Sequence, residues 1–178
     1  MSNTVFIATS LDGYIADVKN EIEWLHSIPN PDNLDMGFER HMSHVDALVM
    51  GRNTYELVFN MACEWPYSKP VFVLSNTLKA IPASLKDKVF IIKGELKALT
   101  KQLNTQGYRN LYIDGGLTIQ NFLKADLIDE MIITTIPILL GGGIALFGEL
   151  DRALEFRCVS SELFNNGICQ NRFQRHRD

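Results

Sequence analysis

The chain has 178 residues, of which 46% are hydrophobic, 21% charged and 10% aromatic. Its 21 Asp and Glu residues outnumber its 17 Lys and Arg residues, which leaves a net charge of −4 at neutral pH. This composition fits one soluble domain over residues 1–178. It argues against disorder, nonspecific nucleic-acid binding and a polybasic membrane contact.

Short apolar runs, rich in β-branched residues, alternate with segments of helical spacing. The runs predict strands and the spaced segments predict helices, so the order indicates an α/β fold with a mostly parallel sheet. The expected strands are residues 4–8, 47–50, 70–74, 89–92, 111–113 and 131–136, and the expected helices are 34–43, 54–61, 95–104 and 118–125.

The C-terminal part differs because no helix is expected between its strands. Segments 129–136, 155–163 and 168–175 read as strands. Asn165-Asn166-Gly167 supplies the positive φ angle of a tight turn, so the last two strands should form an antiparallel hairpin. Ligands of open α/β sheets bind beyond the carboxyl ends of the strands, which places the candidate site in the loops that follow them.

Two of these loops suit a phosphate. In segment 51–56, Gly51 permits close approach, Arg52 offers a bidentate donor, and Asn53 with Glu56 predicts a capping box. A capped helix with a surface arginine is the alternative. The two glycines after Asp114 would let phosphate oxygens approach backbone N–H groups. The alternative interpretation is a tight turn without a ligand.

Two further loops allow more than one interpretation. Ser75-Asn76-Thr77 could hold a sugar or phosphate, or form the more common Asx or ST turn. The glycines of segment 141–143 could form a lid or a bulged turn.

Other chemistries find little support in the sequence. His41 and His44 lie three residues apart without a third ligand, which favours a solvent-facing pair over a metal site. Cys63 and Ser10 have no sequence-local base, so covalent catalysis is not predicted. The three cysteines, Cys63, Cys158 and Cys169, form no CxxC pattern, which predicts reduced and partly buried thiols. The sequence shows no signal or membrane-spanning segment, so a cytoplasmic protein is expected.

Four motifs in this order carry a family resemblance: Ser-Leu-Asp-Gly-Tyr-Ile-Ala at 10–16, Met-Gly-Arg-Asn-Thr-Tyr-Glu at 50–56, Ile-Asp-Gly-Gly at 113–116 and Pro-Ile-Leu-Leu-Gly-Gly-Gly at 137–143. The set resembles the dihydrofolate-reductase-like superfamily. The most similar branch is that of stand-alone proteins grouped with the C-terminal reductase domain of bifunctional riboflavin-biosynthesis enzymes. The resemblance implies a three-layer fold, NADPH as cofactor, a small-molecule substrate and a homodimer.

The resemblance also implies a cofactor site drawn from five parts of the chain. Its residues are Ala8 and Ile15 beside the nicotinamide, Gly51, Arg52 and Thr54 at the phosphates, Ser75 and Asn76 at the adenosine 2′-phosphate, and Gly115 and Gly116 at the pyrophosphate.

For the substrate pocket, the resemblance points to three residues. Asp35 matches a carboxylate that contacts the pterin ring in dihydrofolate reductases, and is the candidate catalytic residue. Phe38 would face the same pocket by the i, i+3 rule, and Thr134 resembles the pocket threonine of the family. The alternative for Asp35 is a charge that complements the helix dipole.

Hydride transfer requires two flat rings held face to face with water excluded, and no nucleophile. These requirements are compatible with what the resemblance implies, an NADPH-dependent reductase with 5-amino-6-(5-phosphoribosylamino)uracil as the preferred substrate. A dihydrofolate reductase and a non-catalytic nucleotide-binding protein are the alternatives. Residues 24–31 are longer and more polar than the Trp-x-Leu-Pro segment of folate enzymes, which disfavours dihydrofolate.

Overall fold

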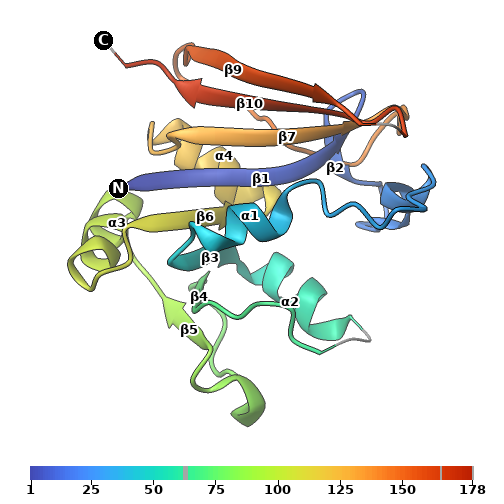
Figure 1. Cartoon of the computed structure of the whole chain (residues 1–178). Coiled ribbons are helices and arrows are strands. Elements are labelled where there is room, and N and C mark those ends of the chain that lie inside the picture. The colour runs from blue at the N-terminus through green and yellow to red at the C-terminus, as the bar shows by residue number, and fades with distance from the viewer. Residues whose placement is uncertain (62–63, 165, 178) are drawn as a thin grey trace.

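The chain folds around an eight-stranded sheet, shown in Figure 1 as a computed structural model. The structure describes residues 1–61, 64–164 and 166–177. Across the sheet the strands follow the order β5-β4-β3-β6-β1-β7-β10-β9. Their bounds are β1 Ser2–Ser10, β3 Ala47–Gly51, β4 Val71–Leu74, β5 Val89–Ile92, β6 Asn110–Asp114, β7 Glu130–Ile136, β9 Phe156–Leu163 and β10 Cys169–Arg175.

The pairing confirms the predicted mixture of parallel and antiparallel strands. All neighbours from β5 to β7 pair in parallel. Strand β10 then runs antiparallel to β7, and β9 antiparallel to β10. Two short strands outside this sheet, β2 (Tyr14–Ala16) and β8 (Ile144–Ala145), pair antiparallel as a ribbon that the sequence pattern did not predict.

Helices lie on both faces of the sheet, so the fold has three layers. Figure 1 shows α1 in front of the strands and α4 behind them. Behind the sheet, Val5 and Ile113 pack with Phe122 of α4, and on the other face Met50 packs with Tyr55 of α2. The helices are α1 Phe38–Ser43, α2 Arg52–Asn60, α3 Leu96–Thr105 and α4 Gly116–Lys124, with short 3-10 turns at Glu23–His26 and Ala83–Leu85.

The first helix is shorter than the sequence pattern predicts. Helix α1 begins at Phe38 instead of residue 34 because Met36 and Gly37 have φ angles of 52° and 82°, which a right-handed helix excludes. The Asp35 carboxylate accepts the N–H groups of Gly37 at 2.9 Å and Glu39 at 2.8 Å, which fixes a turn there.

The predicted capping box of the second helix is wrong. Helix α2 begins at Arg52, two residues earlier than expected, so Gly51 is its N-cap and Asn53 lies inside the first turn. Glu56 does not reach back to the N-terminus; its Oε1 lies 3.8 Å from Nε of Arg52.

The C-terminal hairpin forms where predicted, but its thiols are not buried. Gly167 has a φ angle of 83°, and Phe164 donates its N–H to the carbonyl of Ile168 to close the turn. Cys158 and Cys169 are exposed, and β9 is exposed along nearly its whole length. Asn165 and Cys63 lie outside the described residues. Within the described ranges, no helix has both the length and the apolar character needed to cross a bilayer.

Candidate active site

Two strand-to-helix turns meet at the carboxyl edge of the sheet. Strands β3 and β6 are neighbours, and each leads directly into a helix, α2 after Gly51 and α4 after Gly115. Among the described residues no side chain caps either helix, and neither first turn contains an acidic residue. The backbone N–H groups of both helix N-termini are therefore available to one anion at this edge.

The two turns fit together through glycine and threonine. A Cβ on Gly51 would lie 2.9 Å from Oγ1 of Thr118 in α4. A Cβ on Gly115, whose φ angle is 88°, would overlap Oγ1 of Thr54 in α2. Each glycine thus faces a threonine of the other helix, and the structure brings Gly51, Thr54 and Gly115 together although some 60 residues separate the two segments.

The second glycine of the pair lies beneath the β2–β8 ribbon. A Cβ on Gly116 would lie 2.9 Å from Cδ1 of Ile15 and 3.2 Å from Cγ2 of Ile144. Ile15, expected beside the nicotinamide, is therefore part of the cover over the β6–α4 turn. Arg52 is the first residue of α2, and its exposed side chain forms an ion pair with Glu56 at 3.8 Å.

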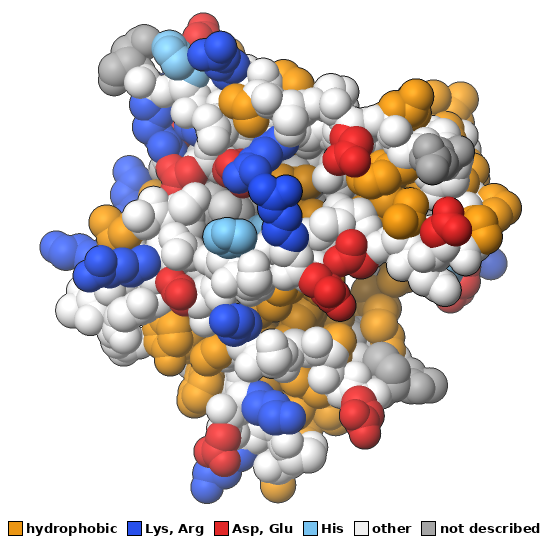
Figure 2. Space-filling view, in the orientation of Figure 1, with side chains coloured by type: hydrophobic (Ala, Val, Ile, Leu, Met, Phe, Trp, Pro, Cys, Tyr) orange, Lys and Arg blue, Asp and Glu red, His pale blue; other side chains and the backbone are white. Residues whose placement is uncertain are grey.

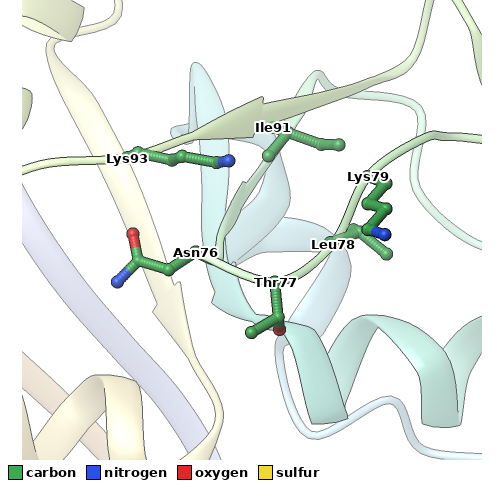
Figure 3. Close-up of a pocket in the computed structure, with 6 residues that line it drawn as sticks. All are labelled: Asn76, Thr77, Leu78, Lys79, Ile91 and Lys93. Carbon is green, nitrogen blue, oxygen red and sulfur yellow. The ribbon is translucent and has the colours of Figure 1, made fainter.

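The loop after β4 contains both a turn and a basic pocket. Ser75 is buried, and its Oγ accepts the N–H groups of Thr77 at 3.2 Å and Leu78 at 3.0 Å, which makes the ST turn. Asn76 is exposed and lines a pocket of about 890 Å³. Figure 3 shows Lys79 and Lys93 on opposite sides of this pocket, with Asn76 on the side of Lys93.

Ala8 and Thr134 are register partners on β1 and β7. The Thr134 hydroxyl accepts a hydrogen bond from Nε2 of Gln170 at 2.8 Å, and the same amide donates to the Met36 carbonyl at 2.9 Å. This network ties the loop before α1 to the sheet beside Ala8.

Asp35 and Phe38 do not lie together on one helix, as the i, i+3 spacing predicted, because α1 begins at Phe38. Phe38 packs in an aromatic cluster with Phe6 and Tyr112, at ring-centroid distances of 5.6 and 6.5 Å. Asp35 precedes the helix and is exposed. Its two backbone hydrogen bonds, to Glu39 and Gly37, hold the pKa of its carboxyl below the ordinary value, so this group is ionised at neutral pH.

Asp114 is a candidate functional residue. It lies within the Ile-Asp-Gly-Gly motif, but the sequence does not distinguish it from its neighbours. It ends β6, and its Oδ1 accepts the Gly115 N–H at 2.8 Å. Burial raises the pKa of this carboxyl to about 6, while hydrogen bonds from Gly115 and the Tyr67 hydroxyl lower it. The glycine pair after Asp114 was the available signal, but only the folded chain shows that Tyr67 faces the carboxylate.

The prediction that His41 faces solvent is wrong. His41 is buried, stacks on Phe6 at 5.0 Å and meets the ring of Tyr112 edge-on at 5.0 Å. Desolvation lowers its pKa to about 4, so the imidazole is neutral, and the nearby charges of Glu130 and Arg172 act in opposite directions.

No metal centre is found in the part of the chain that the structure describes, because no three His, Cys, Asp or Glu side chains gather around one point.

The molecular face that carries α1, shown in Figure 2, has acidic and basic side chains interspersed. The features that suit an anion lie in the two turns and the basic pocket.

The family model of the RibD C-terminal domain matches residues 3–170. The chain belongs to this family. It is 35% identical over 167 residues to the uncharacterized protein YwjB of Bacillus subtilis, with 92% of each chain covered.

Solved structures agree with this assignment. A protein from Shewanella sp. PV-4, provisionally assigned to riboflavin biosynthesis, is 58% identical, with a TM-score of 0.97 over 99% of this chain and 100% of that one. Dihydrofolate reductase from Enterococcus faecalis, solved with NADP(H), has a TM-score of 0.64 at 15% identity, over 99% and 97% of the two chains. The dihydrofolate-reductase-like fold expected from the sequence is therefore confirmed.

Proposed function

We propose that this protein is an NADPH-dependent reductase of a small heterocyclic, ribosylated substrate. The observation that carries the proposal is the pair of helix N-termini after Gly51 and Gly115, which pack together and whose first turns contain no capping or acidic side chain. Two such N-termini suit the two phosphates of a pyrophosphate, since each offers several unpaired N–H donors and a favourable dipole. Membership of the RibD C-terminal domain family supports the same ligand.

The basic pocket supports NADPH over NADH. It lies at the ends of β4 and β5, two strands beyond the β6–α4 turn, where the adenosine end of an extended dinucleotide would reach. Lys79, Lys93 and the Asn76 amide, which line this pocket, are donors for an additional phosphate. Ser75 contributes by fixing the loop, because its hydroxyl is used within the turn.

Bound NADPH would supply the hydride. The chain's part is to hold the ring beside Ala8 and Ile15, to exclude water with the β2–β8 ribbon, and to provide a proton. We propose Asp114 as the proton donor, because it ends β6 directly before the Gly115-Gly116 turn and burial raises its pKa to about 6. Asp35 is ionised there, so we assign it the role of fixing the turn before α1.

Within this class, we propose 5-amino-6-(5-phosphoribosylamino)uracil as the substrate, because the chain belongs to the RibD C-terminal domain family and its 58% identical relative is provisionally assigned to riboflavin biosynthesis. The experiment is NADPH oxidation measured with this compound and with dihydrofolate. Turnover of the first alone supports the proposal. Turnover of dihydrofolate alone would replace the substrate, and failure to bind NADPH would end the reductase proposal.

Cofactor selection is tested with two lysines at opposite ends of β5. Lys93 follows the strand in the pocket, and Lys88 precedes it on the other side. Loss of one charge-assisted phosphate contact should raise the KM for NADPH about tenfold in Lys93→Ala and leave the KM for NADH unchanged. Lys88→Ala should change neither, and equal effects on both cofactors in Lys93→Ala would remove this lysine from the site.

We further propose a homodimer, as the family resemblance implies. The outer hairpin leaves Val159 and Leu163 exposed at 42% and 71%, which provides apolar surface for a second copy. Sedimentation as a monomer at working concentration would reject it.

A further inference from the structure

A second cavity lies between α1 and the outer strands of the sheet. Figure 1 shows that α1 leaves the front of β7, β10 and β9 without a helical cover. The floor of the cavity is one face of three adjacent strands, on which Phe6, Ile132 and Arg172 are register partners. Its wall is α1, which contributes Arg40 and His41. Its volume of about 780 Å³ is typical of a small-molecule site.

A hydrogen-bonded bridge marks the end of this cavity nearest to Ala8. The Gln170 amide of β10 donates to the Thr134 hydroxyl of β7 and to the Met36 carbonyl before α1. Of these residues, Gln170 and Met36 line the cavity, whereas Ala8 and Thr134 do not. A ligand in the cavity would therefore be separate from the nicotinamide and the substrate of the proposed reductase.

His41 has an unsatisfied polar atom at this cavity. The residue lines the cavity and is 8% exposed, and its Nε2 has no hydrogen-bond partner among the described residues. The contacts with Phe6 and Tyr112 fix the plane of the imidazole ring. A buried polar atom without a partner is unfavourable, so a ligand that bonds to Nε2 would gain affinity from it.

A buried ion pair near His41 presents hydrogen-bond donors and an acceptor together. Nε of Arg172 lies 2.9 Å from Oε2 of Glu130, whose side chain is 11% exposed. Within the described chain no hydrogen bond uses the terminal nitrogens of Arg172 or Oε1 of Glu130. Arginine donates to the carbonyl groups of heterocyclic bases, and a carboxylate accepts their N–H groups, so the pair suits the edge of such a ring.

The charges around the cavity favour a ligand without net charge. Among the described residues, its lining includes two arginines and three carboxylates, namely Arg40, Arg172, Asp46, Glu130 and Glu162. The carboxylate of Asp46 is already used, because its Oδ2 accepts two backbone N–H groups. The remaining positive and negative charges balance, so a phosphate ester or a cation would meet repulsion as well as attraction.

We propose that this cavity is a second binding site, for an uncharged nitrogen heterocycle that carries both carbonyl and N–H groups, as purine bases do. Arg172 donates to a ring carbonyl, Glu130 accepts a ring N–H, and Nε2 of His41 bonds to a further ring nitrogen. The apolar floor of Phe6 and Ile132 suits the flat faces of such a ring. The site does not depend on the proposed reductase function.

The test follows the imidazole nitrogens of the protein by NMR during titration with hypoxanthine. Hypoxanthine is an uncharged purine, and benzimidazole is the control ligand because it has the same fused rings without the carbonyl group. The chain has 4 histidines, and the spectrum of His41→Phe, which keeps an aromatic ring beside Phe6, identifies the signals of His41. Hypoxanthine should move these signals and benzimidazole should not. No movement with millimolar hypoxanthine, or equal movement with both ligands, would overturn the site.

Arg172→Lys tests recognition of the ring edge. Lysine keeps a positive charge opposite Glu130 but lacks the planar fork of arginine, so the affinity for hypoxanthine should fall about tenfold. Arg157→Lys is the matched control and should leave the affinity unchanged, because Arg157 is exposed on β9 and does not line the cavity. Equal affinities of Arg172→Lys and the wild-type protein would contradict the proposal.

Saturating NADPH separates this site from the cofactor site. Hypoxanthine should still move the His41 signals when NADPH is present, because the cavity lies beyond the Gln170 bridge. Displacement of hypoxanthine by NADPH would place the base in the cofactor site and overturn the inference. If the protein does not bind NADPH, the reductase proposal fails, and the hypoxanthine titration by itself still decides the second site.

Discussion

Gly115→Ala probes the contact between the two strand-to-helix turns, on which the candidate cofactor site depends. Gly115 has backbone angles of φ 88° and ψ 135°, a region that side-chain-bearing residues avoid. Its added methyl group would overlap Oγ1 of Thr54 and lie 3.2 Å from the Thr54 Cβ. The substitution therefore adds backbone strain and a steric clash at one point.

The two effects have separate magnitudes. Backbone strain of this kind costs about 1–3 kcal/mol. Overpacking against the half-buried Thr54 side chain costs about another 1–3 kcal/mol. Gly115→Ala should thus lower the free energy of unfolding by about 2–6 kcal/mol, a large part of the roughly 5–15 kcal/mol typical of a domain.

Urea unfolding followed by tryptophan fluorescence measures this loss. Gly107→Ala is the control, because Gly107 has a φ angle of 101° but a Cβ there meets no atom of the described chain within 4 Å; it should show strain alone. Thr54→Ala in the Gly115→Ala background removes Oγ1 and should recover about 1–3 kcal/mol. Equal losses at Gly115 and Gly107, with no recovery from Thr54→Ala, would refute the close approach of the turns.

Three further predictions concern groups elsewhere in the fold. In the folded protein the pKa of His41 is lowered from 6.5 to about 4, so between these pH values the unfolded chain binds more protons than the folded one. The free energy of unfolding should therefore fall by up to about 3 kcal/mol as the pH drops from 6.5 to 4. Unfolding of His41→Phe at several pH values should show a shallower slope, and an identical slope would reject the assignment. Asp114→Asn should lower kcat about 100-fold and remove the fall in activity above about pH 6, whereas a retained pH profile would exclude Asp114 as the acid. Arg175→Ala breaks an ion pair with Asp126 in which the arginine side chain is 8% exposed, and should lower the free energy of unfolding by about 3 kcal/mol, measured with urea. Arg152→Ala, where the arginine side chain is 72% exposed, should lower it by less than about 0.5 kcal/mol. Equal losses in the two variants would contradict this reasoning.

Local sequence signals located the elements well where packing and propensity agree. Strand β4, Val71–Leu74, is a continuous apolar run because both of its faces are covered, and it was expected within one residue of its observed bounds. Helix α1 was extended too far because a spacing pattern does not reveal the positive φ angles of Met36 and Gly37. The capping box of α2 failed for a related reason: Asn53 is a good cap residue, but the strand ends early enough for the helix to begin at Arg52.

The candidate site likewise contains features that the sequence reveals and features that depend on tertiary contacts. The glycine loops were visible because glycine pairs after buried strands are unusual without a ligand or a close contact. The sequence does not single out Asp114 and wrongly predicts a solvent-facing His41, since the surroundings of both include Tyr67, Phe6 and Tyr112 from other parts of the chain.

The sequence by itself determined the α/β class, the parallel sheet with its final hairpin, and the loops in which to look for a ligand. These follow from hydrophobic periodicity and turn chemistry, which act over a few neighbouring residues. Only the tertiary structure decided that β3 lies beside β6, so that the turns at Gly51 and Gly115 meet. It also decided that Asp12 bridges two loops more than 100 residues apart. Such contacts depend on strand order and burial, which no local pattern encodes.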